Sequence, residues 1–234
     1  NIPSHLVDTL VAAAEQAMPD PVKAQVVADL RDGLKLSRFT PHPDIGAQEV
    51  TGTQELTFLI RPGQTTQFAV GNTLNSNDAK PYSGDRMDRR LTLGGVDEWT
   101  LQSHFVSHPF HIHVNPFQIV SITDPFGNDV SLPGASDPVL RPNGQPVLGP
   151  GGAPVVDPQY PGLKGVWKDT LWIKSLAPAA PPGTDGYYTV KVRTRYQRYI
   201  GAFVLHCHIL DHEDQGMMQN VEIVVPGDAG HAHP

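Results

Sequence analysis

Histidine and sulfur-containing residues that can bind a transition metal are concentrated in two short segments. Residues 108–113 read HPFHIH, and residues 206–217 begin with His-Cys-His and end with a methionine. Imidazole and thiolate are ligands that suit copper. Cys207 is the single cysteine of the chain, so it cannot form an intrachain disulfide, and its neighbours must indicate its role.

All the donors that a blue-copper electron-transfer centre requires are present. Such a centre uses one thiolate, two imidazoles and a more weakly bound thioether. His212 and Met217 follow Cys207 in the sequence, and the chain can turn after the cysteine so that all three face one metal ion. The second imidazole must come from elsewhere, and His108 is the natural candidate. The sequence therefore predicts a copper site formed by these four residues.

A second group of histidines is expected on the opposite side of the same backbone. Side chains alternate between the two faces of a strand, so His206 and His208 share one face while Cys207 points to the other. By the same period, His111 and His113 share a face of their own strand. These four imidazoles are not used by the first site, and they suit further copper ions.

Other interpretations of these residues are less specific. Zinc is an alternative for any His/Cys cluster, but structural zinc sites more commonly use several cysteines. An isolated His-x-His pair is common by chance, whereas the full pattern around Cys207 rarely arises by accident. Met218 is expected in the core, and His104 in a loop or at a strand end. The remaining histidines are expected on the surface or in the tail: His5, His42, His231 and His233.

The elements that position these residues are predicted to be mostly short strands. The 22 Gly and 23 Pro favour turns and long connections over long helices. Residues 4–32 have helical patterns and predict two helices. Further along, strand patterns recur with turn signals between them. These strands are expected at residues 56–60, 66–70, 90–93, 98–102, 111–122, 167–173, 187–196, 202–207 and 220–225.

Many short strands with intervening turns indicate an all-β sandwich or barrel. We expect a helical extension and linker over residues 1–48, a β domain over 49–226 and a flexible tail over 227–234. Residues 125–161, rich in Pro and Gly, predict a long excursion that covers the surface. The net charge of −7 argues against binding to nucleic acid or to an anionic membrane, and no apolar run approaches the length of a membrane span.

The sequence also resembles the C-terminal cupredoxin domain of multicopper oxidases, the family of laccases, bilirubin oxidases and cuprous oxidases. The resemblance covers roughly residues 50–226. Besides the two metal-ligand segments, it includes DEW at residues 97–99, VNPF at residues 114–117 and WKDT at residues 167–170. It implies a cupredoxin-like Greek-key β-sandwich or barrel.

The resemblance implies a role for each candidate residue. Four residues would bind a type 1 copper, the last as its axial ligand: His108, Cys207, His212 and Met217. Four histidines would bind the other coppers, the first a type 2 ion and the rest a type 3 pair: His111, His113, His206 and His208. Cys207 and its flanking histidines would form the electron path between the sites. Glu213 matches an acidic position that assists proton delivery during oxygen reduction in bacterial members, and a solvated carboxylate is the alternative.

The implied activity is oxidation of a small reducing substrate coupled to reduction of O2 to water at a three-copper cluster. In the family, the other histidines of that cluster lie in an N-terminal domain as two further His-x-His pairs, and no such pair precedes residue 100 here. We therefore expect the C-terminal part of a longer oxidase, inefficient toward O2 alone, whose missing ligands lie in the same polypeptide or in a partner chain. The resemblance also implies export to the periplasm or the cell exterior.

Three alternatives to this function remain open. A single-copper electron carrier would use the first site and leave the four other histidines unused. A nitrite-reductase-like copper enzyme also combines type 1 and type 2 copper, but His-Cys-His with His-x-His favours the oxidase. A zinc-stabilised β domain would show no intense blue colour with Cu(II). With four Met in the chain there is no methionine-rich insertion, which disfavours a dedicated cuprous oxidase.

Overall fold

The computed structural model describes residues 4–32 and 42–227, and the chain divides into two compact units, Asn1–His42 and Pro43–Pro234. In the first unit, helices α1 (Ser4–Ala17) and α2 (Asp20–Arg31) pack through a small apolar cluster of their own. The two predicted helices are confirmed. The expected tail lies outside the described residues, apart from Gly227.

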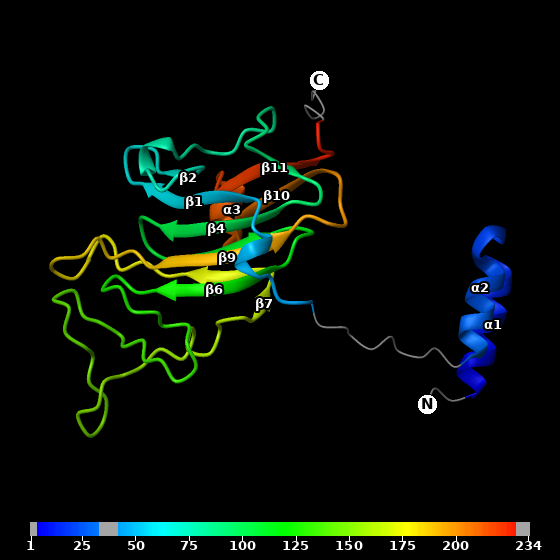
Figure 1. The fold of residues 1–234 in the computed structure, drawn as a ribbon, viewed down its shortest axis with the longest axis horizontal. Coiled ribbons are helices and arrows are strands. Elements are labelled where there is room, and N and C mark those ends of the chain that lie inside the picture. Colours follow the sequence, from blue (N-terminus) through cyan, green and yellow to red (C-terminus); the bar gives the residue numbers. More distant parts are fainter. Residues whose placement is uncertain (1–3, 33–41, 228–234) are drawn as a thin grey trace. The chain divides into compact units, whose positions relative to one another are not determined.

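The second unit is built from two β-sheets, drawn in Figure 1 with α3 and strands β10 and β11 behind the first sheet. The first sheet has the strand order β2-β1-β4-β9-β6-β7, and the second has the order β3-β11-β10-β5-β8. The strands are β1 (Gly52–Arg61), β2 (Gln67–Gly71), β3 (Arg89–Thr92), β4 (Val96–Ser103), β5 (His108–Ile112), β6 (Phe117–Thr123), β7 (Trp167–Lys168), β8 (Thr170–Ile173), β9 (Thr189–Arg195), β10 (Gly201–Cys207) and β11 (Met218–Val224). Short helical turns lie at η1 (Ala47–Glu49), η2 (Ser76–Asp78) and α3 (Leu210–Asp214).

One apolar core lies between the two sheets, because each sheet contributes the alternate side chains of its strands. In β4, for example, Trp99 and Leu101 are buried while Thr100 and Gln102 are partly exposed. The pairs β1–β4 and β3–β11 are parallel, so the chain crosses between sheets instead of forming hairpins alone. The predicted all-β sandwich with a helical N-terminal extension is confirmed.

Two predicted strands are wrong as single elements. Residues 111–122 form the end of β5 in the second sheet and nearly all of β6 in the first, separated by a turn in which Val114 has a φ of 54°. Residues 167–173 likewise divide at Asp169 between β7 and β8. The alternation of apolar residues continues across such a turn, because both sheets face the same core, so the pattern alone does not reveal the break.

The long segment between β6 and β7 contains only isolated β-bridges and extends away from the strands at one end of the domain (Figure 1). It is nevertheless anchored in the core. The fully buried Tyr160 donates a hydrogen bond from its hydroxyl to Trp172 O at 2.6 Å and accepts one from Lys174 N at 2.9 Å. The Lys174 ammonium also pairs with Asp137 and lies 2.8 Å from an Asp157 carboxylate oxygen. The excursion is therefore held to β8 by buried polar contacts.

Residues 43–49 form a strap that packs on the first sheet. Ile45 is 4% exposed, and its backbone N–H donates to Gln118 Oε1 at 2.8 Å. Arg195 donates to the backbone oxygens of Pro43 and Asp44, each at 2.7 Å, and to Glu49 Oε2 at the same distance. The second unit therefore begins at Pro43. None of the helices in residues 4–32 and 42–227 has the length and hydropathy required to cross a membrane.

Candidate metal centre

The loop after β10 folds back on itself and brings the first group of predicted ligands together. Cys207 N donates to Met217 O at 3.0 Å, and Met217 N donates to His212 O at 2.9 Å. These two backbone bonds close the segment that contains α3. Cys207 Sγ then lies 3.8 Å from His212 Nδ1, and the Met217 side chain is fully buried in the same core cluster as Cys207.

His108 is the first residue of β5 and completes this group. Its ring centroid lies 5.2 Å from that of His212. The Ser103 hydroxyl lies 2.7 Å from His108 Nδ1 and donates its one proton to Val106 O, so it accepts the hydrogen bond from the imidazole. His108 Nε2 is then buried and has no hydrogen-bond partner among the described residues. A buried lone pair without a partner is costly unless something outside the protein binds it.

The protonation of this group suits a metal. Burial, and secondarily the neighbouring His212, lowers the pKa of His108 to about 3, so the imidazole is neutral at physiological pH. Burial also lowers the pKa of His212 and raises that of the Cys207 thiol to about 11. Binding of a metal would therefore displace one thiol proton and no imidazole proton. Two neutral imidazoles, one thiol and a buried thioether fit copper in donor type.

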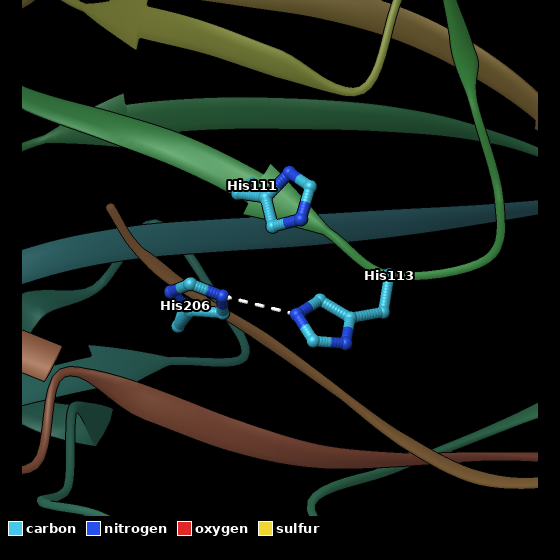
Figure 2. Close-up of side chains that lie close together, drawn as sticks. All are labelled: His111, His113 and His206. Atoms are coloured by element: carbon cyan, nitrogen blue, oxygen red, sulfur yellow. Dashed lines mark hydrogen bonds between the residues drawn. The ribbon is translucent and has the colours of Figure 1, made fainter.

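The second group lies on the other side of the paired strands β5 and β10. Figure 2 shows His111 and His206 on these strands and His113 just after β5, with all three rings directed toward a common space. Their ligand atoms lie within 4.8 Å of one another, and the Nε2 atoms of His113 and His206 are 3.2 Å apart. The His208 ring centroid lies 5.3 Å from that of His111 and 5.6 Å from that of His206.

Hydrogen bonds on the far side of two of these rings, His111 and His206, orient them toward the cluster. His111 Nδ1 lies 2.9 Å from Asp169 O and 2.8 Å from Thr170 Oγ1. His206 Nδ1 lies 3.0 Å from Cys207 O and 3.1 Å from Glu213 Oε2. In both rings Nε2 is left to face the cluster, which is how outer hydrogen bonds prepare a histidine for a metal.

The two groups lie on opposite faces of one strand pair. Cys207 is opposite Phe110 in the register of β10 with β5, and His206 is opposite His111. His113 and His208 are exposed, and a cavity of about 430 Å³ is lined by residues 111–116 and Asp169. Three residues of the first group are buried and His212 is half-buried, whereas two of the four histidines of the second group are exposed.

Several residues that the sequence did not single out contact the two groups. Ser103 orients His108, and Phe68 packs its ring 4.8 Å from the centroid of His212. Asp169 and Thr170, which orient His111, belong to the WKDT motif at residues 167–170 and could have been noticed there. No pattern pointed to Ser103 or Phe68. His104 lies just after β4, outside both groups, and stacks on Tyr187 at 4.0 Å between ring centroids.

Comparison with known proteins points to one family. The family model for multicopper oxidases matches residues 53–227. A laccase from Bacillus stratosphericus is 29% identical over 188 residues, which cover 80% of this chain and 30% of that protein. A bilirubin oxidase from Albifimbria verrucaria is 27% identical over 149 residues, covering 63% and 19% respectively. Among solved structures, a multicopper oxidase from Campylobacter jejuni has a TM-score of 0.46 at 21% identity, covering 79% of this chain and 31% of that one.

The chain spans less than a third of the length of these curated relatives. The family match, however, extends from the second residue of β1 to the end of the described β domain, and it includes every residue of both candidate groups. Since a match of this extent covers most of the chain, the protein belongs to the multicopper oxidase family, and its β-sandwich is a cupredoxin-like domain of that family.

Proposed function

We propose that this chain is the C-terminal, copper-binding domain of a laccase-like multicopper oxidase. His108, Cys207, His212 and Met217 would hold a type 1 copper. When bound at both groups, copper supplies one-electron redox chemistry that takes electrons from a small reducing substrate and reduces O2 to water. The observation that carries this proposal is the buried Nε2 of His108, which has no hydrogen-bond partner in the described part of the chain, beside the Cys207–His212 pair.

The residues of this chain would provide position, burial and a short connection. Cys207 and its neighbours His206 and His208 share one stretch of backbone, so the two groups are joined covalently through consecutive residues. Phe68 and the core around Cys207 would limit the access of water to the first group. Burial lowers the reorganisation energy of electron transfer, because few solvent dipoles have to reorient when the charge changes.

The second group would be completed outside this chain. His111 would contribute to a type 2 site, and His113, His206 and His208 to a type 3 pair. Their openness and the fraction of the relatives' length that the chain spans support further ligands from an N-terminal domain of the same polypeptide, or from a partner chain. Export to the periplasm or cell exterior is part of the same proposal, because members of the family are often found there.

Glu213 would act beside the second group. Its carboxylate lies 3.1 Å from His206 Nδ1, and its side chain is 24% exposed, so it touches both the cluster and the solvent. From this position the carboxylate can hold the His206 ring in place and can carry a proton between solvent and the cavity. Both roles agree with assistance to proton delivery during oxygen reduction.

Cys207→Ser is the test of the first site. We expect the copper-loaded wild-type chain to be intensely blue, and the variant to lose that absorption because the thiolate that produces it is gone. Met218→Leu is the matched control: it changes the other methionine of the segment and should leave the colour intact. Blue colour in Cys207→Ser would disprove the ligand set.

A one-copper electron carrier is the second candidate function, and it is favoured because all four proposed ligands of the first site lie within this chain. Measurements of copper content and oxygen uptake distinguish the oxidase from the electron carrier. In the longest native form, four copper ions per protein support the oxidase and one supports the carrier. For the 234-residue chain alone we expect slow oxygen uptake with a phenolic substrate, and robust turnover would contradict the claim that its second group is incomplete.

A further inference from the structure

A hydrogen-bonded chain of an indole, a phenol and a carboxylate lies in the core and takes no part in either candidate metal group. Trp99 Nε1 donates to the Tyr196 hydroxyl at 2.8 Å. That hydroxyl in turn donates to Asp97 Oδ2 at 3.1 Å, and Gln54 Nε2 donates to the same oxygen at 3.0 Å. Trp99 is 1% exposed, Tyr196 is fully buried and Asp97 is 8% exposed.

We infer that Tyr196 is a redox-active tyrosine that gives up an electron to a high-potential one-electron acceptor while Asp97 takes its proton. In this step the phenolic O–H bond breaks, the electron passes to the acceptor and the proton moves to Asp97 Oδ2. A neutral tyrosyl radical is left. Return of one electron and of the proton from Asp97 restores the phenol, so the step is reversible.

The geometry assigns the electron loss to the phenol. Burial, with a contribution from Asp97, raises the pKa of Tyr196 well above its usual value, so the phenol is protonated and needs a base to be oxidised. Asp97 is a base at hydrogen-bond distance along the existing O–H···O line. Trp99 has no such advantage, because the Arg89 guanidinium lies 4.9 Å from its ring centroid and disfavours a positive charge there.

Trp99 connects this tyrosine to the candidate copper ligands. Its ring centroid lies 6.4 Å from that of Phe110, and Phe110 is opposite Cys207 in the pairing of β5 with β10. If the chain holds copper as proposed, Trp99 and Phe110 would connect Tyr196 to the residues that hold it, so the phenol could supply one electron to that centre. That use rests on the proposed function, whereas the redox activity of Tyr196 does not.

The test uses the full chain without copper, so that its outcome is independent of the copper proposal. A dissolved ruthenium photo-oxidant removes one electron after a light flash, and freeze-quenched samples are examined by electron paramagnetic resonance. We expect the neutral tyrosyl signal of the wild type to fall in Tyr196→Phe, where the remaining signal comes from the partly exposed Tyr82, Tyr187 and Tyr199. Tyr188→Phe is the matched control: Tyr188 is also buried and also donates to a carboxylate, but that carboxylate, Asp137, is paired with the Lys174 ammonium, which makes it a poorer proton acceptor. It should retain the signal.

Two further measurements keep Tyr196 in place and do not depend on the fold of its variant. Formation of the radical should slow in D2O, because a proton moves with the electron. It should also slow in Asp97→Asn, which retains the size of the side chain and removes the base. An undiminished signal in Tyr196→Phe, or the same rate in H2O and D2O, would overturn the inference.

Discussion

At the scale of single residues, the conservative change Met217→Leu is a sharp test of the role of the thioether in the first site. Met217→Leu conserves volume in a fully buried position, so the fold should tolerate it. Because the thioether is a weak axial donor, we expect the blue absorption to persist and the reduction potential to rise, as the oxidised ion loses a donor. Spectroelectrochemical titration measures both. A colourless variant would mean that the methionine is a principal ligand.

The candidate ligands could be predicted from the sequence, but the residues that contact and orient them could not. Spacing along one strand predicted that Cys207 would face away from His206 and His208, and the two faces of β10 agree with that prediction. Phe68 contacts His212 only because β2 meets the loop after β10 in space, and no local pattern encodes packing between such distant segments. Ser103 is close to His108 in sequence, but only the turn between β4 and β5 directs its hydroxyl to the imidazole. Metal binding by these residues remains a prediction.

At the scale of elements, Tyr160 tests the anchorage of the long excursion. Tyr160→Phe removes the hydroxyl that joins Trp172 O and Lys174 N, and leaves both backbone groups without that partner in a buried place. We expect a loss of about 1–3 kcal/mol in the free energy of unfolding. Urea denaturation measures it. Tyr199→Phe, whose hydroxyl bonds Ala202 O in an exposed place, should cost no more than about 0.5 kcal/mol.

The contacts of Glu49 in the strap over residues 43–49 lead us to expect that the stability of the β domain depends on pH. The hydrogen bond from Arg195, followed by one from Gly46, holds the pKa of Glu49 below its ordinary value of 4.5. A lowered folded-state pKa stabilises the fold fully above the unfolded pKa, and this contribution is lost as the pH falls through the folded pKa. The melting temperature of the wild type should therefore fall below about pH 4.5 more steeply than that of Glu49→Gln. Glu15→Gln, in the helical unit, should follow the wild type.

The sequence predicted the type of each secondary-structure element better than it predicted where the element begins and ends. Nearly every predicted strand exists, because alternation of apolar side chains reflects burial on one face. The breaks after Ile112 and at Asp169 were missed, because the chain passes from one sheet to the other without interrupting the alternation. The turn at Val114 gave no signal either, since a β-branched residue rarely takes a positive φ.

At the scale of the whole molecule, the two units have separate cores. The helical unit packs around Val11, Ala14 and Leu30, and the β domain packs around a cluster that begins at Leu56. The linker was expected to extend to residue 48, and the strap contacts of residues 43–48 could not be read from the sequence because their partners lie far along the chain. Gln118, Arg193 and Arg195 are those partners.

Two truncations test where the β domain begins. Removal of residues 1–42 deletes only the helical unit, so the melting temperature and blue absorption of the β domain should be unchanged. Removal of residues 1–48 also deletes Ile45, whose burial contributes about 1.5–3 kcal/mol. It further deletes the backbone oxygens that Arg193 and Arg195 bind, each bond contributing about 1 kcal/mol. Because these contributions act together, we expect the shorter chain to unfold at a clearly lower urea concentration. Equal stability of the two truncated chains would place the boundary at residue 48 and would show that the strap contributes little.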